Sequence, residues 1–400
     1  MRTTARRLLT LFGLGLISLA MADQIALYVL LDEGEFLGRR IAPFDPPLFA
    51  QSQRDALARI DAHLETGTPA LDQFRIDADL GWTNYPDTGG GEFRYDWAGC
   101  RIAGAPLARE KRAGVRRVLT VGCSMTHGDE ADANDTWVAL LGDEPEALEI
   151  GNLGVAGYGL DQALLRLRRA GGELEADEVW LGLLPAAALR VTTVCRALLR
   201  HWEQGVYFKP RFRLGAAGEL VLVPNPGSDL ARTSSFFHSQ AEFLAVTRDD
   251  DWWVGRAPLA YAPRGSSVLH HSFLGRMGLT LHERMGRDLE SMLRDEEGEL
   301  FALVRAIILA TAAETESLGA RFRLLVLPGQ ADLVSAEAGD PHWRALMASL
   351  EREGVEVCDV SNALLEAARE EAAGLFQPGG HYSPRGNAVV AEALRAMVMP

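Results

Sequence analysis

Short apolar runs alternate with helical stretches from residue 116 onward, and this alternation restricts the fold more than any other feature of the chain. The runs cover residues 118–121, 148–153, 179–184, 322–327 and 355–357, and helical patterns occupy residues 160–169 and 387–397. Strands that alternate with helices predict a parallel sheet that is covered on both faces. We therefore expect an α/β fold with three layers, α/β/α, around a parallel sheet of about five strands.

A long stretch separates the third strand from the fourth. It has about 140 residues, which is more than one crossover needs. We expect an insertion at about 195–300 that forms a cap beside the sheet, with a hairpin over residues 213–223, followed by a helix over residues 300–317. Trp252 and Trp253 lie within the insertion, and they suit either its internal packing or a carbohydrate-binding face.

The segment before the regular pattern is mixed in character. Prolines interrupt it at positions 43, 46 and 47, a short helix is expected over residues 53–64, and three glycines at 89–91 indicate a loop. We expect residues 1–32 to form a signal peptide or membrane anchor. Residues 33–115 are then a juxtamembrane region with an N-terminal appendage, and residues 116–400 are the main domain.

The N-terminus has the charge layout of an export signal or an anchor. Arg2, Arg6 and Arg7 precede an apolar run over residues 8–31 that only Asp23 and Gln24 interrupt. The run is long enough to span a bilayer, whereas the small residues around Ala22 also suit cleavage. We expect a protein of the bacterial cell envelope, anchored in the inner membrane with its main domain periplasmic or extracellular. The alternative is secretion after cleavage at Ala22.

Charge and cysteine content exclude several classes of partner. The 400 residues include 40 basic and 55 acidic side chains, and the net charge of −15 argues against nucleic acid and makes an anionic polymer a less natural substrate. The four cysteines, at 100, 123, 195 and 358, form no CxxC motif, so we expect buried free thiols. His127 and the pair at 270 and 271 lack carboxylates at regular spacing, so we expect no metal and no cofactor.

Three loops that follow predicted elements hold the residues suited to chemistry, because ligands bind at the carboxyl ends of parallel strands. The loops read VGCSMTHG at 121–128, GNLGVAGYG at 151–159 and GGHYSPRGN at 379–387. The first places the Ser124 hydroxyl at a helix N-terminus, and the last places His381 just before the C-terminal helix. Taken alone, Ser124 also fits a helix cap, and His381 fits a surface or core residue.

Together and in this order, the three loops resemble the SGNH (GDSL-type) hydrolase superfamily. The similarity extends to its membrane-associated bacterial branch through DADLGW at 77–82, YDWAGCR at 95–101 and YFKPRF at 207–212. The resemblance implies a flavodoxin-like sheet, with Ser124 as nucleophile and His381 as general base. It also implies an oxyanion hole made from the backbone N–H groups of Ser124 and Gly157.

The chain departs from this pattern at three positions. Cys123 replaces the aspartate before the serine, and Ala186 in LLPAAALR stands where the family has an asparagine that serves as a third oxyanion donor. The aspartate expected two or three residues before His381 is Gly379 or Pro378. The histidine then needs another acceptor to orient it, either a backbone carbonyl or one of the carboxylates of Asp129, Asp161 and Asp359.

The sequence leaves three functions open. The first is an SGNH-like esterase that removes O-acyl groups from an envelope or secreted glycan or lipid, so its partner is an acylated small molecule or glycan, with the membrane reached through the N-terminal helix. The second is an O-acyltransferase on the same scaffold, in which a sugar hydroxyl replaces water. The third is a degenerate SGNH-like protein kept for binding or assembly.

Overall fold

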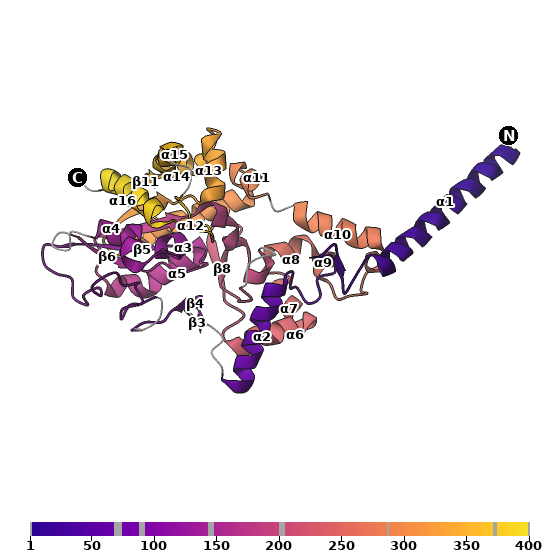
Figure 1. The fold of residues 1–400 in the computed structure, drawn as a ribbon, viewed down its shortest axis with the longest axis horizontal. Helices are drawn as coiled ribbons and strands as arrows, with labels where there is room; N and C mark the ends of the chain where they lie inside the picture. Colours follow the sequence, from indigo (N-terminus) through magenta and orange to yellow (C-terminus); the bar gives the residue numbers. More distant parts are fainter. Residues whose placement is uncertain are drawn as a thin grey trace. The chain divides into compact units, whose positions relative to one another are not determined.

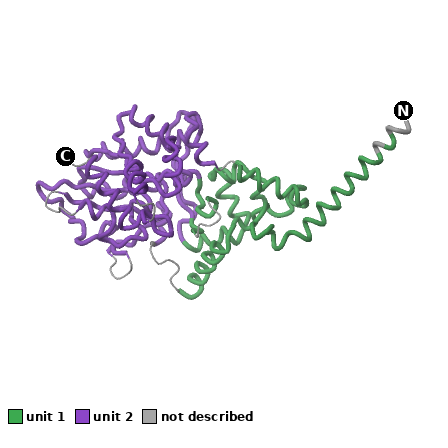
Figure 2. Tube along the Cα trace, turned by 45° about the horizontal axis from the view of Figure 1, so that its top comes forward, with its two compact units in different colours: residues 1–70, 193–207, 230–287 green, residues 71–192, 208–229, 288–400 purple. Residues whose placement is uncertain are grey.

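The fold is known from a computed structural model that describes residues 2–67, 74–87, 93–142, 148–199, 205–285, 288–370 and 374–398 (Figure 1). The loop expected at 89–91 lies outside these residues. The chain divides into two compact units, coloured separately in Figure 2. Unit 1 comprises residues 1–70, 193–207 and 230–287, and unit 2 comprises residues 71–192, 208–229 and 288–400.

These units interleave along the chain, whereas the division expected from the sequence is linear. Residues 1–70 pack with the two insertion segments of unit 1: Phe44 N–H donates to Ala260 O over 2.7 Å, and Gln53 Nε2 donates to Ala197 O over 3.1 Å. Residues 71–115 instead belong to the unit that contains the sheet.

Unit 2 is built on a five-stranded, all-parallel sheet in the order β11-β10-β7-β5-β6. In chain order this is the 2-1-3-4-5 arrangement of a flavodoxin-like fold, as expected. The central strands are buried on both faces, which explains their continuous apolar runs. The strands are β5 (Arg116–Val121), β6 (Leu148–Asn152), β7 (Glu178–Leu183), β10 (Arg321–Val326) and β11 (Val357–Asp359).

The last strand begins two residues later than predicted. Val355 N–H donates to Leu350 O over 3.1 Å and closes the preceding helix, and Gly354 turns the chain with φ +86°. Residues 355 and 356 therefore connect the end of the preceding helix to the strand and are not part of the strand.

Helices form the two outer layers of unit 2. One group places α12 against α5 and α14, and a second places α16 against α4 and α15, as right-handed crossovers in this strand order require. The helices are α3 (Ser124–His127), α4 (Trp137–Leu141), α5 (Leu160–Ala170), α11 (Leu289–Arg294), α12 (Glu299–Ser317), α13 (Gln330–Glu337), α14 (Arg344–Arg352), α15 (Ser361–Glu370) and α16 (Pro384–Val398).

In the described part of unit 2, two antiparallel hairpins accompany the main sheet. They pair β3 (Phe74–Asp77) with β4 (Gly81–Asn84), and β8 (Arg211–Leu214) with β9 (Leu220–Val223), the second of which is the predicted hairpin. Three short 3-10 helices are η1 (Ala133–Asp135), η2 (Gly171–Glu173) and η3 (Pro185–Thr192).

Unit 1 is mostly helical. Its elements are α1 (Arg2–Val29), β1 (Glu35–Phe36), β2 (Arg39–Arg40), α2 (Gln51–Thr66), η4 (Arg196–Leu198), α6 (Leu230–His238), α7 (Gln240–Thr247), α8 (Trp252–Arg256), α9 (Pro258–Tyr261), η5 (Val268–His271) and α10 (Phe273–Met285). In α1, Thr10–Val29 has a mean hydropathy of 1.6 and is unburied, so it is long and apolar enough to cross a membrane. The rings of Trp252 and Trp253 are buried and stacked, so the carbohydrate-binding interpretation of this pair is wrong.

Candidate active site

Ser124 lies where the central strand β5 turns into the short helix α3. Gly122 makes the turn with φ +157°, and a Cβ there would collide with Thr126 Oγ1 and would lie 2.9 Å from Gly182 O. Ser124 is the first helical residue and is 6% exposed. Within the described residues its Oγ has no hydrogen-bond partner, so the side chain does not serve as a structural cap. The first N–H groups of a helix are unpaired by geometry, and the Ser124 N–H is one of these.

The loop after β6 runs alongside this turn. Val155 N–H donates to Gly122 O over 3.1 Å, and Trp82 Nε1 donates to Ala156 O over 2.8 Å. Gly157 has φ +78°, a conformation that favours glycine. Its N–H donates to no residue in the described part of the chain, as is also true of the Ser124 N–H. Both amides are thus available to a ligand.

A buried ion pair supports the beginning of the helix that follows this loop. Lys209 Nζ donates to Asp161 Oδ2, and both side chains are fully buried. Lys209 Nζ also donates to Pro210 O over 3.0 Å, and Gln162 Nε2 donates to Leu80 O over 2.7 Å. The segments at 77–82 and 207–212, which carry the resemblance to the membrane-associated branch, therefore have a structural role: they hold the beginning of α5, directly after the glycine loop.

His381 is held in a fixed turn immediately before α16. Gln377 N–H donates to His381 O over 2.7 Å, and the adjacent Tyr382 donates its hydroxyl to Pro328 O over 2.8 Å. The imidazole is 23% exposed. Its Nδ1 lies 2.6 Å from Glu130 Oε2, and its Nε2 has no partner among the described residues.

Glu130 is the acceptor that the sequence did not reveal. Besides His381 Nδ1, its carboxylate accepts the Gly379 N–H at 2.9 Å and the His381 N–H at 3.3 Å. Partial burial opposes ionisation, but the hydrogen bonds from His381 and Gly379 outweigh it and hold the pKa of Glu130 below its usual value. Glu130 follows the nucleophile loop by only a few residues, in a left-handed conformation with φ +60°.

The three carboxylates considered from the sequence are engaged elsewhere. Asp161 binds Lys209, and Asp129 binds His127 Nδ1. Asp359 accepts Trp343 Nε1 at 2.9 Å and the Ser361 N–H at 2.8 Å. The expectation that one of them, or a backbone carbonyl, orients His381 is therefore corrected: Glu130 occupies that position.

A second histidine, His127, is buried at the end of α3, three residues after Ser124. His127 is 2% exposed; its Nδ1 contacts Asp129 Oδ1, and its Nε2 lies 2.9 Å from the Tyr95 hydroxyl. Burial opposes ionisation of Asp129, but its contact with His127 and the positive charge of Arg101 hold its pKa below the usual value. Among the described residues, no cluster of three histidine, cysteine or acidic side chains is arranged to hold a metal ion.

The remaining predicted positions lie near the end of β7 and of β5. Ala186 lies in η3, directly after β7, and its methyl side chain offers no donor to an oxyanion. A small pocket there is lined by Gly122, Cys123, residues 158–160, residues 182–184 and Ala187. Cys123 is buried and has a free thiol, as have the other three cysteines.

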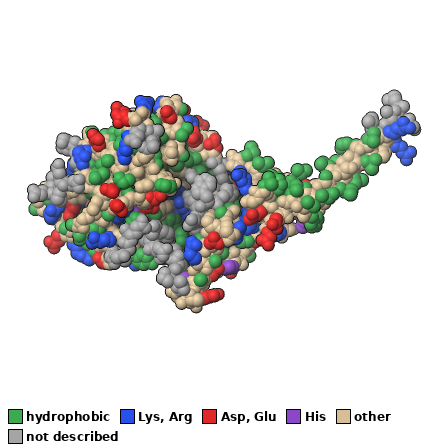
Figure 3. All heavy atoms as spheres, in the orientation of Figure 1, with side chains coloured by type: hydrophobic (Ala, Val, Ile, Leu, Met, Phe, Trp, Pro, Cys, Tyr) green, Lys and Arg blue, Asp and Glu red, His purple; other side chains and the backbone are tan. Residues whose placement is uncertain are grey.

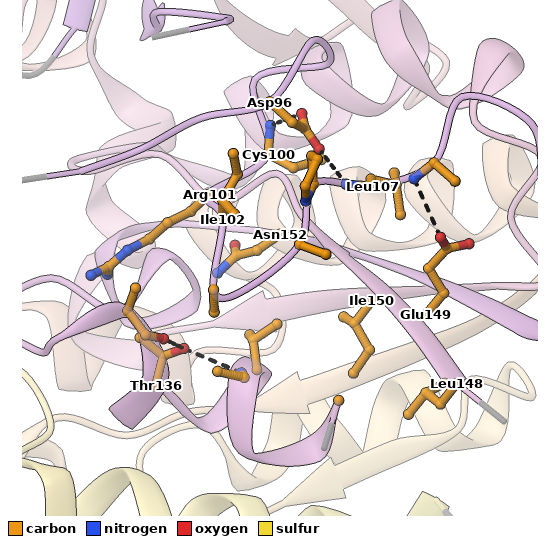
Figure 4. A pocket seen from close by; sticks show the side chains of 18 of the residues that line it. Asp96, Cys100, Arg101, Ile102, Leu107, Thr136, Leu148, Glu149, Ile150 and Asn152 are labelled. Atoms are coloured by element: carbon orange, nitrogen blue, oxygen red, sulfur yellow. Dashed lines mark hydrogen bonds between the residues drawn. The ribbon is translucent and has the colours of Figure 1, made fainter. Parts of the chain in front are cut away.

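A larger cavity of about 330 Å³ lies beside the edge strand β6 and is shown in Figure 4. Its carboxylates are used by the protein itself. Asp96 accepts the amides of Cys100 and Leu107 at 2.9 and 3.1 Å, and Glu149 accepts the Ala108 amide at 3.3 Å and binds Arg117. Neither Ser124 nor His381 lines this cavity, so we place the candidate site at the serine and histidine loops.

Several solved structures are similar to the chain. A member of the lipolytic G-D-S-L family from Veillonella parvula is 12% identical, with 71% of this chain and 98% of that one covered and a TM-score of 0.36. A catalytic mutant of an acetylxylan esterase from Geobacillus stearothermophilus is 13% identical, with 72% and 97% covered and a TM-score of 0.36. An acetyl xylan esterase is 11% identical, with 71% and 100% covered and the same TM-score.

No family model and no curated protein matches the chain. The structural matches are proteins of the type that the motifs resemble. At these identities and TM-scores they carry no argument about the reaction, which we therefore derive from the chain's own residues.

Proposed function

We propose that the chain is a serine-dependent, SGNH-like esterase that removes O-acyl groups from an envelope or secreted glycan or lipid. The observation that carries this proposal is the 2.6 Å contact between Glu130 and His381 Nδ1, which leaves Nε2 without a partner among the described residues. A carboxylate on Nδ1 selects the tautomer whose Nε2 accepts a proton, and it stabilises the imidazolium that then forms. In this arrangement His381 is prepared to act as a base.

In the proposed reaction, His381 Nε2 accepts the hydroxyl proton of Ser124 while Oγ forms a bond to the acyl carbon of the ester. The tetrahedral intermediate collapses when the bond to the alkoxy oxygen breaks, and the leaving alcohol takes the proton from His381. Water then attacks the acyl-enzyme with its proton passing to the same nitrogen, and Ser124 leaves with that proton as the carboxylic acid is released.

The developing oxyanion needs donors that are in place before the reaction. The unpaired amides of Ser124 and Gly157 are the donors we assign. The position of Ala186 supplies no side-chain donor, and loss of one such donor typically lowers turnover by about 10²–10³. We therefore expect slow turnover with unactivated esters and faster acylation by activated ones.

For the compartment, we propose that α1 stays attached as an inner-membrane anchor, with unit 2 and the rest of unit 1 outside the cytoplasm. The support is that α1 continues without a break past Ala22 to Val29, and that Arg2, Arg6 and Arg7 precede the apolar segment. N-terminal sequencing of the protein from a membrane fraction tests this. Recovery of chains that begin at Asp23 contradicts it.

A fluorophosphonate probe tests the reaction directly, because its phosphorus bonds only to an activated serine oxygen, with loss of fluoride. We expect the full chain, purified in detergent, to be labelled, and Ser124→Ala to be unlabelled while keeping the same circular dichroism spectrum. Absence of Ser124-dependent labelling refutes the proposal and favours a binding role. Labelling without hydrolysis of aryl esters directs the search to acyl transfer onto a sugar hydroxyl.

A further inference from the structure

Helix α10 carries an apolar stripe on its outer face. The stripe is formed by residues at the i, i+3, i+7 and i+11 positions of the helix, which are Leu274, Met277, Leu281 and Met285. Leu274 is 57% exposed, Leu281 is 54% exposed and Met285 is 81% exposed. The opposite side is buried and polar. Arg276 Nε donates to Ala42 O over 2.6 Å there. The buried face of α10 therefore makes this contact with the rest of unit 1, and the apolar stripe takes no part in it.

Neighbouring segments of unit 1 extend this apolar surface. Val268, in the adjoining η5, is 83% exposed. Leu37, in the β1–β2 turn, is 85% exposed, and the ring of the preceding Phe36 packs edge-on against Phe273 with centroids 5.2 Å apart. We call Leu37, Val268, Leu274, Leu281 and Met285 the α10 patch. Several exposed large side chains in one place indicate a contact surface.

The start of α10 is joined to α1 by Asp23 and Gln24, the two residues that interrupt its apolar run. Asp23 Oδ1 accepts the Leu274 N–H at 2.8 Å and the Ser272 hydroxyl at 3.2 Å, and Gln24 Nε2 donates to His271 O over 2.7 Å. A carboxylate is favourable at a helix N-terminus, where the amides are unpaired. Asp23 therefore has partners inside the protein. The α10 patch continues the exposed apolar surface of α1, whose hydrophobic side chains are seen in Figure 3.

The position of this junction along α1 sets the depth of α10. Tyr28 lies in the last turn of α1 and is 80% exposed, and tyrosine is typical of the membrane–water interface. Asp23 precedes Tyr28 by five residues, which is about 7.5 Å along a helix at 1.5 Å per residue. Amphipathic helices that lie on membranes insert their apolar face by about 5–10 Å. The start of α10 is thus at the depth that an interfacial helix occupies.

From these observations we propose that α10 is a second membrane-binding element, which lies in the outer interface of the bilayer with the α10 patch in contact with lipid. This inference rests on α1 spanning the membrane, and it is independent of the proposed esterase chemistry. The bilayer is the occupant because the α10 patch is continuous with the apolar surface of α1 and meets it at interfacial depth. The two membrane contacts, α1 and the α10 patch, then fix the orientation of unit 1 on the membrane. With α1 alone, the unit would be free to rotate about that helix.

Lipid-borne quenchers test the proposal on the full chain in proteoliposomes. Leu281→Cys and Met285→Cys are labelled with an environment-sensitive nitrobenzoxadiazole dye. The four native cysteines are buried and stay in place, with labelling of the unsubstituted chain as background. Ile17→Cys, in the middle of α1, is the control for spanning. Leu64→Cys is the matched control, since it is an exposed leucine on α2 of the same unit, outside the α10 patch.

We expect the dye at 281 and 285 to be blue-shifted and quenched most by lipids spin-labelled near the headgroup, and the dye at 17 to be quenched most by lipids labelled deep in the acyl chain. The dye at 64 should be unaffected by either lipid. Quenching at 17 without quenching at 281 and 285 overturns the role of α10 and leaves the anchor intact. A blue shift at 281 and 285 that no lipid quenches indicates a protein partner or a second copy, and it also overturns the proposal. No quenching at 17 overturns the anchor together with this inference. Fluorophosphonate labelling in the same proteoliposomes reports separately on the esterase.

Discussion

Replacing Glu130 by glutamine is the most direct test of how the site is assembled. The carboxylate accepts three hydrogen bonds, one from His381 Nδ1 at 2.6 Å and two from the amides of Gly379 and His381. Glutamine keeps the length of the side chain, but one oxygen becomes an NH₂ group. If its oxygen stays on the Gly379 amide, the NH₂ faces two donors, the His381 amide and Nδ1. The imidazole then gains Nε2–H, the tautomer that cannot accept the serine proton.

The size of the effect follows from the charge and the exposure of the pair. A hydrogen bond to a charged group contributes about 1.5–3 kcal/mol. Since each 1.36 kcal/mol changes a rate by tenfold, the expected slowing is about 10- to 150-fold. Removal of a fully buried triad carboxylate lowers turnover by about 10⁴. We expect less here because the Glu130 side chain is 33% exposed and water screens its charge.

The assay is the second-order rate of fluorophosphonate labelling at Ser124, measured for the unsubstituted chain, Glu130→Gln and Asp132→Asn. The last variant removes the same charge from an exposed position two residues along, which among the described residues has no hydrogen bond or ion pair with His381. We expect Glu130→Gln to be slow and Asp132→Asn to retain the unsubstituted rate. Equal rates for all three chains, or equal slowing in both variants, refute the reasoning that Glu130 acts through its contact with His381.

Three further predictions concern the stability and geometry of the site, with unfolding measured by urea titration in detergent. Gly157→Ala places a side chain at φ +78°, so we expect a loss of about 1–2 kcal/mol of stability together with slower labelling. Lys209→Met leaves the Asp161 carboxylate buried and unpaired, and it should cost about 3–5 kcal/mol. Adding Asp161→Asn should restore part of that loss, and an equal loss in the double variant contradicts the explanation. The pKa of Asp129 is lowered in the fold, so its ionised form stabilises the protein at neutral pH, and this contribution is lost as the pH falls through the lowered value. Asp129→Asn should therefore be less stable than the unsubstituted chain at pH 7, with a difference that shrinks below about pH 4, near the ordinary pKa of aspartate.

The sheet could be predicted from the sequence because its strands are buried on both faces. Residues 118–121 and 179–184 are continuous apolar runs for that reason, and their order along the chain required helical crossovers. The interleaving of the two units was not predictable in the same way. It depends on single polar contacts between distant segments, such as Gln53 Nε2 with Ala197 O, which leave no periodic pattern.

Glu130 was missed for a related reason. No spacing rule relates position 130 to position 381, and the acidic pair at 129 and 130 looks like an ordinary loop. The two segments meet because α16 packs against α4, where Asn387 Oδ1 accepts the Trp137 N–H at 3.0 Å. That packing places the loop before α16 next to the loop after α3. Only the tertiary structure contains this information.

Two of the three departures from the SGNH pattern, those at Ala186 and before His381, therefore differ in kind. The acid missing before His381 is replaced by Glu130, from the loop after α3, which accepts the amides of the same histidine turn as well as Nδ1. The asparagine missing at Ala186 has no such side-chain replacement at its own position. On the proposed function, a chain with this combination should activate its nucleophile well and stabilise its oxyanion less well. Activated reagents would then react readily at Ser124 while turnover of natural esters stays slow, a pattern that a site degenerate at both positions does not produce, because it would fail to activate the serine at all.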